Sequence, residues 1–205
     1  IEGNTLTLQE TALVIDKGIT ISGKSVHEHL EAINHSEAVE LLHDLVQNKI
    51  ELTEYVLKQL HGLILRGINK NNAGKYRSVN VMISGSRHRP PEPFMLEKLM
   101  EDYFLFYEIN KTTMHPVLLA AEMHERLVTI HPFIDGNGRT SRLVMNLILM
   151  KHGYPITNIS GDRENRLSYY SSLETAQVEN NKIKFYDFVS DAVACSLKEF
   201  LQIVK

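Results

Sequence analysis

The chain has 205 residues, enough for one domain with a substantial hydrophobic core. Hydrophobic residues make up 43% of it, charged residues 23%, and the net charge is -3, which argues against intrinsic disorder and against a basic nucleic-acid-binding surface. No apolar run reaches the ~18 residues that a membrane span needs. We therefore expect a globular protein with no nucleic acid partner and no membrane partner.

The single cysteine, Cys195, cannot form a disulfide within the chain, and its apolar neighbours favour a buried thiol. Scarce cysteine suits a reducing compartment, so we expect a cytoplasmic protein. The first residue is Ile1 rather than Met, which indicates a fragment or a processed chain.

Most of the sequence has helical periodicity. Ser25 and Thr53 are typical helix caps, Pro116 is typical of a first helical position, and Gly153 is a typical stop. The pattern predicts seven helical segments, at residues 25–46, 54–65, 94–109, 116–130, 139–153, 162–177 and 184–204.

One segment differs from this pattern. Residues 78–89 contain β-branched side chains and a turn at Gly85, which predicts a short β-hairpin or an extended flap. We therefore expect one all-α domain over residues 1–205, a helical bundle that carries a short β-hairpin flap.

The most informative stretch is HPFIDGNGRTSR, residues 131–142. His131 ends a predicted helix, and Pro132 forces it out of helical geometry, so its imidazole is fixed where it can accept a proton from a hydroxyl. Asp135 is a turn residue that can also hold Mg²⁺, which in proteins takes one or two carboxylates plus substrate phosphates.

The loop that follows is suited to an anion. Gly136 and Gly138 tolerate positive φ, so the loop can turn its N–H groups inward, and Asn137 can add a side-chain donor. Arg139 and Arg142 are three residues apart at the start of a helix, where a positive charge is unfavourable unless an anion binds. Residues 136–142 therefore predict a phosphate-binding site.

These twelve residues match the core motif of the Fic family at every specified position. The chain also resembles this family at its start, IEGNTLTL, and in GKSVHEH and LSYYSSLETA, which are similar to the metazoan endoplasmic-reticulum member. The resemblance implies a Fic-fold helical bundle that transfers AMP from ATP to a Ser, Thr or Tyr hydroxyl of a target protein. It also implies that some members form homodimers, so a homodimer is a further expectation here.

The resemblance assigns roles to the motif residues. It makes His131 the catalytic base and Asp135 the Mg²⁺ ligand. It places the α-phosphate at Gly136, Asn137 and Gly138, and the outer phosphates at Arg139 and Arg142.

The resemblance also extends outside the motif. It places adenine near Tyr169 and Tyr170, and it makes the flap residues Asn80, Val81, Met82 and Ile83 a docking edge for the target's backbone. Family members of this class carry an inhibitory glutamate, here Glu2, which pairs with the motif's last arginine, Arg142. Glu2 and the γ-phosphate of ATP would then compete for one guanidinium.

Several alternatives remain. The same active site could remove AMP, transfer UMP, phosphocholine or a phosphoryl group, or only sense ATP. Residues 18–25, GITISGKS, match the P-loop pattern, with TALVID, residues 11–16, as the required strand, although a turn and helix cap at Gly23, Lys24 and Ser25 fits better. A zinc hydrolase is excluded because neither His27-Glu28 nor His124-Glu125 completes the H-E-x-x-H pattern.

Overall fold

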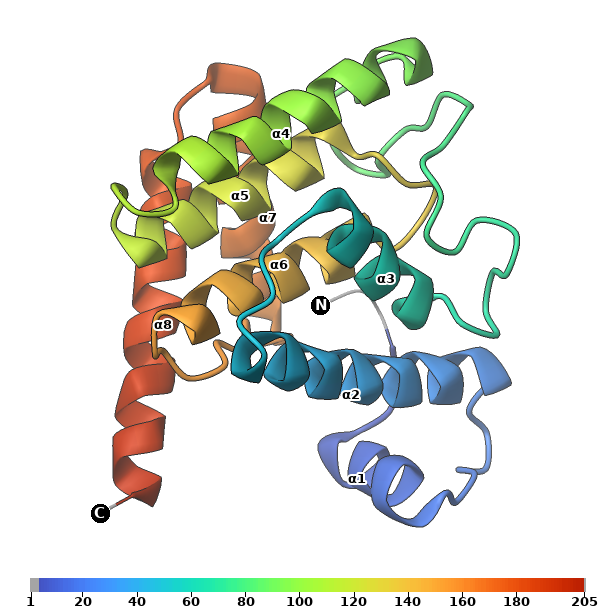
Figure 1. Cartoon of the computed structure of the whole chain (residues 1–205). Helices are drawn as coiled ribbons and strands as arrows, with labels where there is room; N and C mark the ends of the chain where they lie inside the picture. Colours follow the sequence, from blue (N-terminus) through green and yellow to red (C-terminus); the bar gives the residue numbers. More distant parts are fainter. Residues whose placement is uncertain (1–3, 205) are drawn as a thin grey trace.

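The computed structural model describes residues 4–204, and these form eight α-helices and one short 3₁₀ helix (Figure 1). The elements in chain order are α1 (Leu8–Lys17), α2 (Val26–Gln47), α3 (Glu54–Ile64), η1 (Pro93–Met95), α4 (Leu96–Asn110), α5 (Pro116–Ile130), α6 (Asn137–Lys151), α7 (Arg163–Glu179) and α8 (Ile183–Ile203). The predicted all-helical fold is confirmed, and all seven predicted helices are present.

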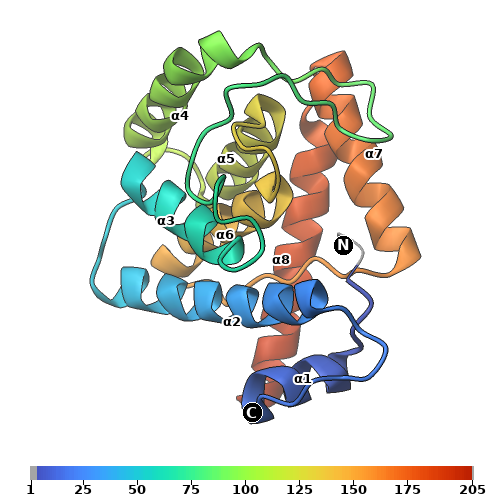
Figure 2. The same cartoon turned by 90° about the vertical axis from the view of Figure 1, so that its right-hand side faces the viewer.

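The core is built around the hairpin of α5 and α6, whose contact is the most extensive in the fold. Most side chains of both helices are buried, so neither helix is amphipathic in the way of a surface helix. α2 and α3 pack on α6, while α4 and α8 pack on α5 (Figures 1 and 2). The connection between α5 and α6 carries residues 131–136, so the motif is held between the two most buried helices.

The sequence analysis missed α1. Its start is marked by a capping box, in which the Thr7 hydroxyl accepts a bond from the Glu10 N–H and the Glu10 side chain accepts one from the Thr7 N–H. The helix ends at Gly18, which is left-handed with φ 63°.

The P-loop alternative is wrong. Residues 11–16, the candidate strand, lie inside α1, and no strand occurs within residues 4–204. Lys24 donates to the Thr5 carbonyl at 2.5 Å, and Ser25 caps α2. These residues form the turn and helix cap that the alternative interpretation predicted.

Of the two forms predicted for residues 78–89, the β-hairpin is wrong, because the segment contains no strand, and the structure has the extended flap. Its backbone closes one turn, from the Ser86 N–H to the Ile83 carbonyl, around Gly85 with φ 76°. Its two ends are tied to other parts of the molecule. Arg77 donates to the carbonyls of His131, Val79 and Pro91, and His88 donates to the Thr129 carbonyl. This anchoring replaces the cross-strand pairing that a hairpin needs.

Cys195 is exposed on α8, which corrects the expected burial of this thiol, and its Sγ lies 3.6 Å from Glu199 Oε1. The buried face of α8 carries Val189 and Val193, and Cys195 lies outside it. Within residues 4–204, no helix is both long and apolar enough to cross a bilayer.

Candidate active site

Buried side chains on the core side of the loop between α5 and α6 hold this loop in place. Asn137 closes it by donating to the Phe133 carbonyl and accepting from the Phe133 N–H, both at 2.9 Å. The Phe133 ring stacks on His61 at 3.6 Å between centroids. The Asn137 amide therefore shapes the loop, a role that the sequence analysis did not assign to it.

His61 from α3 fixes the same loop as a neutral imidazole. Its Nε2–H donates to the Asp135 carbonyl at 2.9 Å, and its Nδ1 accepts the Gly74 N–H at 2.9 Å. Burial lowers the pKa of His61 to about 4, so it is uncharged near neutral pH. The neutral ring has one donor and one acceptor nitrogen, and both are used here. An uncharged side chain therefore holds the loop near neutral pH.

His131 terminates α5 in a left-handed conformation, with φ 51° and ψ 57°. Its own N–H still bonds the Leu127 carbonyl, so the strained residue is held by the helix end. The ring Nδ1 lies 3.2 Å from the Val128 carbonyl. Because a carbonyl can only accept, Nδ1 carries the hydrogen and Nε2 keeps its lone pair. Burial lowers the pKa of His131 to about 4, so the ring is a neutral proton acceptor at pH 7.

Helix α6 begins two residues earlier than predicted, with the left-handed Gly136 as its N-cap, φ 75°. No side chain among the described residues caps this end. The N–H groups of its first turn have no acceptor within the helix, and the macrodipole makes this end positive. The end is thus suited to an anion.

Arg139 is held between two carboxylates. Its Nη1 lies 2.8 Å from Glu31 Oε1, and its Nη2 lies 3.2 Å from Asp135 Oδ2. Asp135 Oδ1 accepts the Gly136 N–H at 2.6 Å. Glu31 belongs to α2, and no local sequence pattern connects it to a residue 108 positions away. These contacts fix the guanidinium at the entrance of the loop.

Helix α7 places the two predicted tyrosines differently. Tyr169 is buried, and its hydroxyl lies 3.2 Å from His124 Nε2. Tyr170 is 47% exposed and packs edge-on against Tyr169 at 5.2 Å. Tyr169 therefore has mainly a packing role, and Tyr170 is the tyrosine more available to a ligand.

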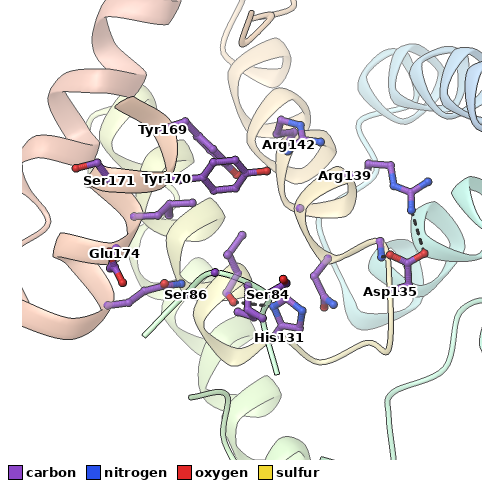
Figure 3. Close-up of a pocket in the computed structure, with 18 of the residues that line it drawn as sticks. Ser84, Ser86, His131, Asp135, Arg139, Arg142, Tyr169, Tyr170, Ser171 and Glu174 are labelled. Atoms are coloured by element: carbon purple, nitrogen blue, oxygen red, sulfur yellow. Dashed lines mark hydrogen bonds and ion pairs between the residues drawn. The ribbon is translucent and has the colours of Figure 1, made fainter. Parts of the chain in front are cut away.

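These elements enclose one cavity of about 780 Å³, within the usual range of small-molecule sites (Figure 3). All the predicted motif residues line it: His131, Asp135, Gly136, Asn137, Gly138, Arg139 and Arg142. Both tyrosines line it as well. In Figure 3, Asp135 and Arg139 lie on one side and Glu174 and Ser86 on the other.

The remaining predicted residues fall elsewhere. Of the four flap residues, Ile83 lines the cavity. Met82 is 77% exposed, and Asn80 and Val81 lie in the same outer part of the flap. Glu2 lies outside the described residues, so its pairing with Arg142 stays a prediction.

Sequence reasoning missed further residues of the cavity wall, including Glu31, Ser84, Ser86 and Glu174. They come from α2, the flap and α7, and only the fold brings them together with the motif. None of them stands in a recognisable spacing relative to residues 131–142.

Comparison with known proteins agrees with this geometry. The sequence profile of the Fic/DOC family matches residues 51–149. A Fic domain-containing signalling protein from Bacteroides thetaiotaomicron is 30% identical, with a TM-score of 0.87 over 96% of this chain and 80% of that one. This chain belongs to the Fic/DOC family.

Other Fic relatives extend the match to nearly the whole chain. Fic-1 from C. elegans superimposes with a TM-score of 0.88 at 29% identity, covering 99% of this chain and 60% of that one. A curated relative from Drosophila grimshawi, named protein adenylyltransferase Fic, is 37% identical over 98% of this chain. The Drosophila melanogaster protein of the same name is 36% identical over 98% of it. The chain spans 41% and 40% of the lengths of these two curated relatives.

Proposed function

We propose that this chain is a catalytic domain that transfers AMP from ATP to a hydroxyl group of a target protein. The single observation that carries the proposal is the convergence in one cavity of a neutral His131, an uncapped helix N-terminus at Gly136 and two arginines, Arg139 and Arg142. The curated Drosophila relatives, named protein adenylyltransferase Fic, support this choice of reaction.

The proposed step uses each of these groups. His131 Nε2 takes the proton of the target hydroxyl while its oxygen attacks the α-phosphorus of ATP. A bond forms between that oxygen and phosphorus, and the bond to the bridging oxygen breaks, so that pyrophosphate leaves. The N–H groups at the start of α6 stabilise charge on the α-phosphate, and the arginines hold the outer phosphates.

Mg²⁺ is a finer part of the proposal. Asp135 offers one carboxylate at the edge of the loop, and the described residues contain no cluster of three or more metal-ligating side chains. A single carboxylate fits Mg²⁺ better than a transition metal, because Mg²⁺ takes its other ligands from phosphates and water. Bound there, the ion would neutralise phosphate charge, and Asp135 would exchange its contact with Arg139 for the metal.

Further parts of the proposal come from the family resemblance. Glu2 acts as a brake by pairing with Arg142, and residues 80–83 of the flap dock the target's backbone. Residues 80–83 have no strand partner within residues 4–204, which leaves an edge for an added strand.

The test is transfer of label from ATP, UTP and GTP by the Glu2→Gly form in the presence of cell lysate. We expect AMP transfer from ATP, stronger than for the unchanged chain. Adding His131→Ala should reduce the rate by about 10²–10⁴-fold, the usual contribution of a general base. Mass spectrometry of the labelled proteins identifies both the added group and the acceptor residue.

Other results would favour other functions. ATP binding without any nucleotide transfer would support a sensing domain. Transfer from UTP in place of ATP would support a different nucleotide specificity. Equal labelling with and without Glu2 would refute the brake.

A further inference from the structure

The flap is connected to α7 across the mouth of the cavity. The Arg87 N–H and the Arg87 Nε both donate to Glu174 Oε1, each at 3.0 Å. Gly85 and Ser86, just before Arg87, line the cavity, and so does Glu174. In Figure 2 the segment between α3 and α4, which contains the flap, extends to α7. We call the Arg87–Glu174 pair the clasp.

The clasp lies at a defined end of the cavity. Glu174 is on the same helix as Tyr170 and Gln177, both of which line the cavity. The phosphate loop and Arg139 lie on the opposite side (Figure 3). A nucleotide with its phosphates on α6 would therefore have its nucleoside end next to the clasp.

The clasp adds to a small number of other contacts that hold the flap on this side of the cavity. Its two ends are anchored by Arg77 and His88, which donate hydrogen bonds to the backbone carbonyls of His131 and Thr129. Between these anchors the flap has one internal backbone bond, the turn from Ser86 to Ile83. A segment with so few internal bonds opens easily unless another contact holds it.

The clasp also neutralises a charge in the cavity wall. Glu174 places a carboxylate in the wall of a cavity that is suited to an anion, and Arg87 neutralises it. The Arg87 backbone N–H, with the side chain, lowers the pKa of Glu174, so this carboxyl is ionised at neutral pH. Without Arg87, the carboxylate would face the nucleotide uncompensated.

We propose that Arg87 is a positioning residue that holds the flap against Glu174 and so slows the release of bound nucleotide. The inference rests on the proposed function, because it takes the cavity to be a nucleotide site. It goes further by assigning nucleotide retention to two residues outside the motif. Because the side chains are 67% and 31% exposed, the clasp is a weak, salt-sensitive contact that opens and closes readily.

The test is a charge-reversal cycle read by the release of a fluorescent ADP derivative in stopped flow. ADP is chosen because it lacks the γ-phosphate that Glu2 is expected to oppose. Arg87→Glu places two carboxylates in contact and Glu174→Arg places two cations in contact. We expect each single variant to release nucleotide about two- to fivefold faster, and the double variant to return most of the way to the original rate.

The Glu174→Arg variant separates the clasp from simple charge attraction. A new cation in the cavity wall attracts an anion, so attraction alone predicts slower release, whereas loss of the clasp predicts faster release. Slower release by this variant, or a double variant no better than the singles, overturns the inference. As a matched control, reversing the exposed Lys98–Asp102 pair on α4, 2.9 Å apart and outside the cavity, should leave release unchanged.

The two proposals fail in different ways. AMP transfer with unchanged ADP release in both single variants overturns the clasp alone. Faster release by both single variants, restored in the double variant and without any nucleotide transfer, supports the clasp and leaves the transferase proposal refuted. Thermal unfolding of each variant shows that the fold is intact before release is measured.

Discussion

The charge state of His131 gives the sharpest test of the active-site geometry. Burial lowers its pKa to about 4 from the ordinary 6.5. At pH 5.5 an ordinary histidine is about 10% neutral, whereas a ring with a pKa of about 4 is about 97% neutral. Removing the shift would therefore reduce the available base about tenfold at that pH.

The pKa can be measured directly by NMR. Titration of the histidine ring resonances, with the His131 signal assigned through its absence in His131→Ala, should show at most about 10% protonation of this ring down to pH 5. Protonation of this ring should not limit the rate of AMP transfer by the Glu2→Gly form over the same pH range. Its effect on the rate should appear only as the pH approaches about 4.

The stability of the fold depends on the same shift. A histidine whose pKa is depressed in the folded state binds protons more readily when unfolded, so acid destabilises the native state from about pH 6.5 downwards. Circular dichroism at each pH therefore separates loss of the base from unfolding. A midpoint near 6.5 for His131 in the folded protein would refute the reasoning, because it would mean that the ring is solvated and its Nδ1–H is not held by the Val128 carbonyl.

Two further changes test the framework of the active site. Gly136→Ala adds a Cβ to a residue with φ +75°, so it should lower the free energy of unfolding by about 1–2 kcal/mol and weaken ADP binding. Gly153→Ala is the matched control, because Gly153 also has a positive φ, +82°, but lies in open space. It should cause a similar loss of stability and leave ADP binding unchanged. Lys182→Met removes the cation that lies 2.7 Å from each of the buried carboxylates of Glu122 and Glu125, while Arg126 still pairs with Glu122. Denaturant unfolding should show a loss on the order of 3 kcal/mol, the lower end of the range for a buried charge that loses its partner. A loss below about 1 kcal/mol would mean that the network is as weak as a surface ion pair.

The sequence was sufficient to predict the elements whose signals are local. Ser25 and Thr53 cap helices where capping residues were expected, and Pro116 starts α5. α1 was missed although the Thr7–Glu10 capping box was present in the sequence. The β-branched residues within TALVID suggested a strand, whereas the capping box and the packing of α1 on α2 both favour the helix.

The flap shows where local signals fail. Its β-branched residues have strand propensity, but a hairpin also needs two segments that pair, and this segment is fixed by Arg77 and His88 to carbonyls elsewhere in the fold. Arg77 is 4% exposed, and a basic residue beside a flap gives no indication in the sequence that it will be buried among carbonyls. The motif predicted which residues would meet at the phosphate loop, whereas Glu31 and His61 reach this loop from distant segments and Glu174 lies in the opposite wall of the cavity.

The two halves of the active site differ in how they are held, and this difference has a functional consequence. The base and the phosphate loop stand on the buried α5–α6 hairpin, where Asn137 and His61 satisfy the loop's backbone through short, buried bonds. The opposite wall is a flap with one turn and one exposed ion pair. Transition-state stabilisation needs fixed donors, because donors that must reorganise lose much of their effect, whereas substrate entry and release need a wall that opens. The arrangement therefore places rigidity where the chemistry is proposed and mobility where nucleotide and target must pass, and substitutions in the flap should alter binding rates more than the chemical step.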